Sequence, residues 1–170
     1  AYNFQDAKQI ELMMSSLWRI VKRKRSDQAT EQFRTILEQS PNSIVITDPQ
    51  GVIQYVNPKF CQVTGYGRDE AIGQRPSILK SGETTSDDYR SLWERIASGG
   101  IWHGEFHNRR KDGELFWESA TISPLRNTSN EITHFFAIKE DITEKKKVEL
   151  ELRRSHELFR ATIASLDDLM

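Results

Sequence analysis

The spacing of apolar residues changes twice along the chain of 170 residues, and each change marks a boundary between predicted elements. Residues 1–40 favour a helical linker, because apolar residues recur every three or four positions and residues 4–40 hold neither glycine nor proline. Residues 41–142 contain short β-branched runs separated by turn residues, which indicate a folded domain built on a sheet. Residues 143–170 return to helical spacing and are predicted to form a C-terminal helix.

Two strands, several short helices and three further strands are predicted in the middle segment. The predicted strands cover residues 43–48, 52–56, 101–110, 114–125 and 132–142. The first two form a hairpin around Pro49-Gln50-Gly51, and Asn57-Pro58 then opens a short helix. A longer helix is predicted near residues 85–98, ended by Gly99-Gly100, with Tyr89, Leu92, Trp93 and Ile96 on one face. This order predicts an α+β fold, in which helices pack on one face of a five-stranded antiparallel sheet.

The C-terminal helix has a start signal and an apolar seam. Asp141 and Glu144 have the spacing of a capping box, which predicts that the helix begins there. Seven positions then alternate at spacings of four and three, and five of them are apolar, as in a coiled-coil seam. These positions are Val148, Leu152, Ser155, Phe159, Thr162, Leu166 and Leu169. We expect a homodimer through the flanking helices, the alternative being a lone helix that folds back on the sheet.

Composition and charge restrict the class of protein. Hydrophobic residues make up 36% and charged residues 29% of the chain, and the net charge of -1 argues against a dedicated nucleic-acid binder. The single cysteine, Cys61, excludes an internal disulfide and any site built from several cysteines. No apolar run is long enough to span a membrane, so we expect a cytoplasmic domain. The cations at residues 22–25 could lie at an anionic membrane surface, but such a cluster is more often a solvated helix turn.

Little else in the sequence indicates chemistry. His103, Glu105 and His107 alternate along one predicted strand, where neighbours on a face lie about 6–7 Å apart, too wide for a single metal ion. No nucleophile–base pair, phosphate-binding glycine loop or pair of catalytic carboxylates can be identified. We therefore expect neither a metal site nor an enzyme.

Asn108 is the polar residue that needs an explanation. Strand alternation places it on the same face as Trp102, Gly104 and Phe106. An unpaired amide on that apolar face would cost about 1–3 kcal/mol. The polar edge of a ligand, a backbone group or a buried water would each satisfy it.

Several short motifs, in this order along the chain, resemble those of PAS domains, the small sensory modules of bacterial signalling proteins. The motifs are Ile46-Thr47-Asp48, Gly51-Val52-Ile53, Tyr55-Val56-Asn57, Phe60, Thr64-Gly65-Tyr66, Gly104-Glu105, the run 108–114, Ile122-Ser123-Pro124 and the run 141–144. The resemblance covers residues 32–152. It implies a sensor whose state passes through Asp141 and Thr143 into the C-terminal helix, and from there to an output domain such as a histidine kinase or diguanylate cyclase. Residues 159–168 resemble the opening of another PAS repeat.

A second set of residues narrows the resemblance to flavin-binding PAS domains of nitrogen-fixation redox sensors and aerotaxis receptors. This set comprises the run 78–82, Tyr89, Leu92-Trp93, Gly100, Trp102, Gly104 and Asn108-Arg109-Arg110. The resemblance implies bound FAD, with Trp93 against the isoalloxazine ring and Asn108 on its polar edge. Phe60, Ile78 and Leu79 complete the expected cofactor contacts.

Two departures from these relatives qualify the expectation. The redox sensors carry an acidic residue near the ring where Pro76 stands here, so proton coupling would need another group. Light-sensing relatives form a flavin–cysteine adduct from a short helix, but residues 73–98 contain no cysteine. We therefore expect no adduct photochemistry. The alternative to a cofactor-loaded sensor is a ligand-free PAS domain that serves only dimerisation and spacing.

Overall fold

The computed structural model describes residue 24 and residues 27–167, with side chains placed through residue 160. Two units are distinguished, residues 1–39 and residues 40–170, and each is described by itself. In the first unit a helix covers residues 27–38, in agreement with the predicted linker helix. The rest of that prediction, including the apolar set before residue 22, lies outside the described residues.

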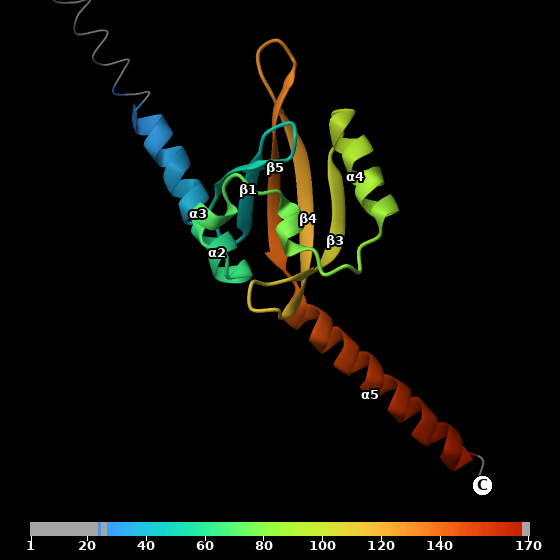
Figure 1. Cartoon of the computed structure of the whole chain (residues 1–170). Helices are drawn as coiled ribbons and strands as arrows, with labels where there is room; N and C mark the ends of the chain where they lie inside the picture. Colours follow the sequence, from blue (N-terminus) through green and yellow to red (C-terminus); the bar gives the residue numbers. More distant parts are fainter. Residues whose placement is uncertain (1–23, 25–26, 168–170) are drawn as a thin grey trace, which may run out of the picture. The chain divides into compact units, whose positions relative to one another are not determined.

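The second unit contains a five-stranded antiparallel sheet with the predicted α+β architecture (Figure 1). Its strands are β1 (Ser43–Thr47), β2 (Ile53–Val56), β3 (Trp102–Arg109), β4 (Leu115–Arg126) and β5 (Ile132–Asp141). They follow the order β2-β1-β5-β4-β3, so that β1 and β5 are neighbours although they are far apart in the sequence. The β-branched runs and their turn residues predicted all five strands, each within one residue of its observed bounds.

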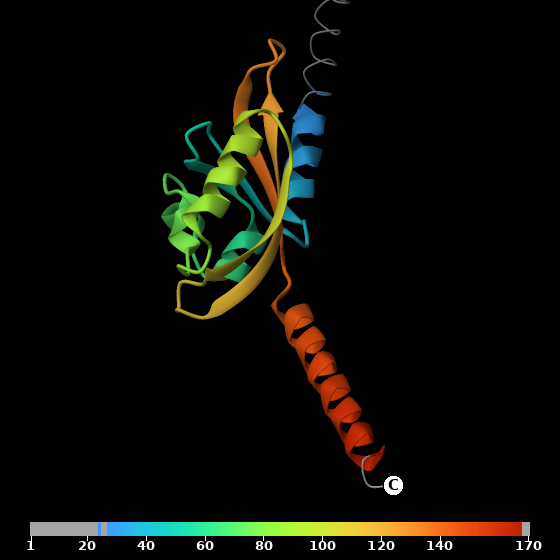
Figure 2. The same cartoon turned by 90° about the vertical axis from the view of Figure 1, so that its right-hand side faces the viewer.

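The helices of this unit pack on one face of the sheet (Figure 2). They are α2 (Pro58–Thr64), α3 (Arg68–Ala71), the 3-10 helix η1 (Pro76–Leu79) and α4 (Ser86–Ala97). Asn57 begins α2, because its buried side chain accepts a hydrogen bond from the Phe60 N–H at 3.0 Å. Thr85 and Asp88 form a capping box that begins α4. Side-chain caps thus define the first residues of both helices, and the cap at Asn57 agrees with the helix start predicted at Asn57-Pro58.

Two apolar clusters form the core between the helices and the sheet. One cluster includes Phe60 and Leu79 and packs against β1 and β2. The other includes Leu92, Phe106 and Phe135, and joins α4 to β3 and β5. Ile122 contacts both clusters, which makes the core continuous across the inner face of the sheet.

One residue of β5 departs from simple strand alternation. Strict alternation would place Ile132 on the same face as His134, Phe136 and Ile138. The β4–β5 register is irregular, since Leu125 pairs with His134 while Arg126 pairs with Ile132. The extra residue rotates the strand, and Ile132 packs on the inner cluster instead.

The last helix, α5 (Thr143–Asp167), begins at the predicted residue, but Asp141 and Glu144 do not form the predicted capping box. The carboxylate of Asp141 accepts from the backbone N–H and the hydroxyl of Thr143, at 3.0 and 2.6 Å, rather than from the backbone of Glu144. Apolar side chains along α5 are exposed, including Val148 and Phe159 at 63% and 69%. Dimerisation through this helix stays a prediction. None of the described helices is both long and apolar enough to cross a membrane.

Candidate functional site

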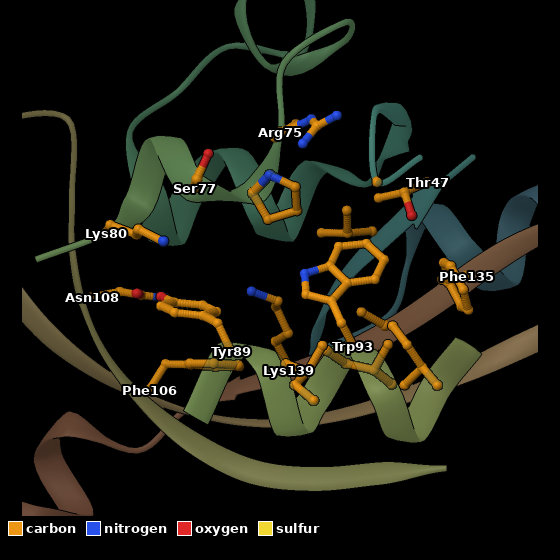
Figure 3. A pocket seen from close by; sticks show the side chains of 17 residues that line it. Thr47, Arg75, Ser77, Lys80, Tyr89, Trp93, Phe106, Asn108, Phe135 and Lys139 are labelled. Carbon is orange, nitrogen blue, oxygen red and sulfur yellow. The ribbon is translucent and has the colours of Figure 1, made fainter. Parts of the chain in front are cut away.

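A cavity of about 300 Å³ lies between α4, the segment around η1 and the inner face of the sheet (Figure 3). Much of its lining is apolar or aromatic. The apolar lining includes Val45, Leu92, Ile96, Phe106, Ile122 and Phe135. Its volume is at the lower end of the range for small-molecule sites, which suits a planar ring system.

Helix α4 supplies one wall of the cavity. All four apolar residues predicted on one helix face, Tyr89, Leu92, Trp93 and Ile96, line it. The indole of Trp93 meets the ring of Phe135 edge to face, with centroids 5.7 Å apart and an interplanar angle of 81°. This contact holds the indole against the cavity although Trp93 is 40% exposed.

Gly51 is the residue that makes room for this indole. A Cβ at Gly51 would lie 2.7 Å from Cη2 of Trp93, and the backbone there has a φ of +80°. A side chain is therefore excluded both by the neighbouring ring and by the turn between β1 and β2.

A buried group of three polar side chains lies beside the cavity, and two of them, Asn108 and Lys139, line it. Asn108 donates from Nδ2 to Oε1 of Glu118 at 2.8 Å, and Lys139 donates from Nζ to the same oxygen at 2.5 Å. Asn108 is 5% exposed, while the Lys139 and Glu118 side chains are 7% and 2% exposed. The partner of the Asn108 amide is thus a carboxylate, which the sequence analysis did not consider.

Sequence reasoning missed Glu118 and Lys139, although strand alternation contained a signal for both. Glu118 lies between Phe116 and Ala120 on the inner face of β4, and Lys139 follows Ala137 on the inner face of β5. Two opposite charges at inward positions of neighbouring strands indicate a buried ion pair.

The charged residues that line the cavity are all cations. Arg75, Lys80 and Lys139 line it, and the lining includes no Asp or Glu in the described part of the chain. The ammonium of Lys80 lies 3.9 Å from the centroid of the Tyr89 ring. Burial raises the pKa of the Tyr89 hydroxyl above its ordinary value, a hydrogen bond with Thr84 opposes that rise, and the charge of Glu118 adds to it.

The structure divides the predicted cofactor contacts into two groups. Trp93 and Asn108 line the cavity, as does Pro76. Phe60 and Leu79 are 2% and 0% exposed in the first core cluster, and Ile78 packs against that cluster. Phe60, Ile78 and Leu79 are not among the described residues that line the cavity. They could affect ligand binding only through their packing in the core.

The junction with α5 brings the two predicted relay residues together. Arg110 donates to the carboxylate of Asp141 at 2.7 Å and also to the backbone oxygen of Val63. The backbone N–H of Trp117 donates to the hydroxyl of Thr143 at 2.9 Å. Partial burial alone would raise the pKa of Asp141, but hydrogen bonds from Thr143 and Arg110 outweigh it and hold that pKa below its ordinary value. The start of α5 is therefore tied to β4, α2 and the end of β3.

Other candidate groups lie apart from the cavity. His103 contacts Thr121, Glu105 pairs with Lys146, and His107 pairs with Glu83, so each has a different partner. Across residue 24 and residues 27–167, the structure shows no cluster of three His, Cys, Asp or Glu residues suited to a metal ion. Cys61 lies on α2 and is not among the described residues that line the cavity.

Comparisons with known proteins agree with this architecture. A family model described as "PAS domain" matches residues 41–144. A nitrogen fixation regulatory protein of Klebsiella oxytoca is 32% identical over 134 residues, which cover 79% of this chain and 27% of that protein. A blue-light-activated histidine kinase of Brucella canis is 33% identical over 134 residues, which cover 77% of this chain and 26% of that protein.

Among solved structures, the LOV domain of a blue-light activated histidine kinase from Erythrobacter litoralis EL346 is similar with a TM-score of 0.58. It is 28% identical, and the match covers 62% of this chain and 99% of that domain. The chain spans about a quarter of the length of the curated relatives described above.

Proposed function

This chain belongs to the PAS domain family, and from that premise we propose that it is the flavin-binding sensory module of a signal-transduction receptor. The observation that carries the proposal is the cavity beneath α4, whose lining combines Trp93 and other aromatic rings with the polar side chains of Asn108 and Lys139. Flat aromatic walls with a few polar groups at one end are typical of sites for planar heterocycles.

The residues present suit a flavin in three respects. The indole of Trp93 offers an aromatic surface for the ring system, and the ammonium of Lys139 offers donors to its carbonyl oxygens. Arg75 and Lys80 offer positive charge to an anionic tail. A volume of about 300 Å³ suits the ring and not a whole dinucleotide, so the tail of FAD would extend outward past the exposed residues Arg75, Ser77 and Lys80.

The names of the relatives give independent support for a coloured ligand. Protein side chains do not absorb blue light, so a blue-light-activated histidine kinase needs a chromophore. A bound flavin would supply both blue absorption and a site that accepts electrons. Adduct chemistry is not part of the proposal, because the only cysteine of the chain, Cys61, is on α2.

The signal would leave the cavity along β5. Lys139 lies two residues before Asp141, whose carboxylate binds Arg110 and the first residue of α5. A change in the position of β5 at the cavity would shift these hydrogen bonds and move α5. In the parent protein α5 would pass this movement, within a dimer, to an output domain such as a histidine kinase or a diguanylate cyclase.

Absorption spectroscopy tests the proposal. The purified protein, as isolated or after addition of FAD, is expected to show the bands of an oxidised flavin. W93A and N108A should lose the bound flavin, while W117F, which alters a tryptophan on the outer face, should retain it. A colourless wild-type protein that takes up no added flavin would contradict the proposal.

One observation favours a ligand-free alternative. Every buried side-chain polar atom in the described part of the chain has a hydrogen-bond partner. The cavity therefore needs no ligand to satisfy it, and the domain could act only in dimerisation and spacing. Sedimentation of a colourless but dimeric protein, with V148A or F159A disrupting the dimer, would support this second function.

A further inference from the structure

The buried ion pair of Lys139 and Glu118 is not expected to make the fold more stable than two apolar side chains would at the same positions. The two side chains are 7% and 2% exposed, and the ring centroid of Phe106 lies 5.6 Å from Nζ of Lys139. Removing two charges from water costs several kcal/mol per ion, and well-packed apolar replacements are often neutral or stabilising. Stability of the fold therefore does not account for this pair.

The two members of the pair hold different positions relative to the cavity. Lys139 lines the cavity, whereas Glu118 is not among the described residues that line it. Figure 3 shows the nitrogen of Lys139 directed into the space between Tyr89 and Trp93. An ammonium carries three N–H donors, and the bond to Glu118 occupies one of them. Lys139 is thus a donor aimed at whatever fills the cavity.

Glu118 orients this donor. Its Oε1 accepts from both Lys139 and Asn108, which fixes the three side chains relative to one another. Two exposed residues of the cavity lining, Arg75 and Lys80, are also cations. A ligand without an acceptor at its inner end would leave the Lys139 donors unsatisfied, at a cost of about 1–3 kcal/mol.

We propose that Lys139 is the specificity-determining residue of the cavity, and that it selects planar ligands whose inner edge is anionic or strongly hydrogen-bond accepting. Glu118 is its internal counter-ion and positioning residue. This inference rests on the proposed function for the existence of a ligand, and it names the chemistry of that ligand. A flavin ring, with its carbonyl oxygens and ring nitrogens, and an aromatic carboxylate both meet the requirement. A neutral hydrocarbon of the same shape does not.

Isothermal titration with matched ligands tests the proposal. Riboflavin presents the flavin ring without an anionic tail, 2-naphthoate presents an aromatic carboxylate, and 2-naphthylmethanol is the neutral counterpart of the naphthoate. The protein variants are K139R, the apolar double variant E118L/K139M and the charge-swapped E118K/K139E. The control is K146M, which removes a lysine on the outer face.

Wild type, K139R and K146M should bind riboflavin, naphthoate or both. E118L/K139M should bind them at least about tenfold more weakly, the equivalent of one charge-assisted hydrogen bond. It should bind 2-naphthylmethanol no more weakly than wild type does. The charge-swapped variant should lose naphthoate altogether, because it turns a carboxylate toward the ligand. A role of the pair in folding alone would not produce this dependence on ligand charge.

The outcomes separate this inference from the proposed function. Equal riboflavin binding by wild type and a folded E118L/K139M overturns the inference and leaves flavin binding intact. Lysine-dependent binding of naphthoate without any flavin binding overturns the flavin proposal and supports the inference. Binding of neither ligand by wild type overturns the inference. If the double variants fail to fold, ¹⁵N-lysine spectra of wild type decide, since the ligand must shift the ammonium signal of Lys139 and leave that of Lys146 unchanged.

Discussion

Two lysine–glutamate pairs lie on opposite faces of the same sheet and differ mainly in their exposure. On the inner face, Lys139 and Glu118 are 2.5 Å apart, with side chains 7% and 2% exposed. On the outer face, Lys146 of α5 and Glu105 of β3 are 2.7 Å apart, with side chains 37% and 44% exposed. Water screens the outer pair far more than the nearly buried inner pair, so similar geometry leads to very different energies. The comparison shows that the distance between two opposite charges does not by itself indicate how much the pair contributes to stability.

Breaking the inner pair should have the largest effect. E118L leaves the ammonium of Lys139 buried without a counter-ion, and we expect it to lower the free energy of unfolding by about 3–5 kcal/mol. The double variant E118L/K139M should recover most of that loss, because it removes the charge that was left unpaired. Urea denaturation measures both values. An E118L protein as stable as wild type would show that the inner pair is solvated.

Adding one methyl group beside Trp93 should have the next largest effect. In G51A the new Cβ meets both the indole and a φ of +80°, and we expect a loss of about 1–3 kcal/mol together with a change in Trp93 fluorescence. G113A is the matched control, because its φ is +96° and nothing lies within 4 Å of the added Cβ. The excess loss in G51A over G113A measures the contact with Trp93. Equal losses would mean that the indole moves aside freely.

The junction at α5 should respond to pH. The pKa of Asp141 is lower in the folded protein than its ordinary value of 3.8, so its carboxylate contributes stability fully above that value and loses it as pH falls toward the folded pKa. D141N should lower the free energy of unfolding at neutral pH by about 1 kcal/mol, since it removes charge-assisted hydrogen bonds at a partly exposed site. Below about pH 4 the stability difference between D141N and wild type should shrink. A difference that stays constant on acidification would contradict this assignment.

Breaking the outer pair should have the smallest effect. K146M removes an ion pair that water already screens, and we expect a loss of less than about 1 kcal/mol. The loss should decrease further as salt is added. Thermal unfolding at low and high ionic strength provides the measurement. A loss as large as that of E118L would refute the contrast between the two faces.

The strands and the α4 face could be predicted because they depend on local patterns. β-branched runs between turn residues defined all five strands, and helical spacing placed Tyr89 and Trp93 on the face that lines the cavity. The position of Ile132 could not be predicted, because an irregular strand register depends on pairing with β4 and leaves no local mark.

The candidate site was predicted in part. Asn108 was identified as a buried polar residue, but its partner Glu118 lies on another strand, where alternation along the strand of Asn108 gives no information. Phe60 and Leu79 were assigned to the cofactor by resemblance, whereas packing against β1 and β2 places them in the core. A pattern along one strand shows which face a residue occupies, and only the assembled layers show what it contacts.

The pairing of the first strand with the last has a consequence for how this domain is built into longer proteins. β1 and β5 run antiparallel as neighbours, with Ser43 opposite Lys139, so the chain enters and leaves the sheet at the same end. A domain with adjacent ends can be inserted between two helices, duplicated in tandem or exchanged for another without stretching the segments on either side. The same arrangement makes the middle strand, β5, the one that leads directly into α5.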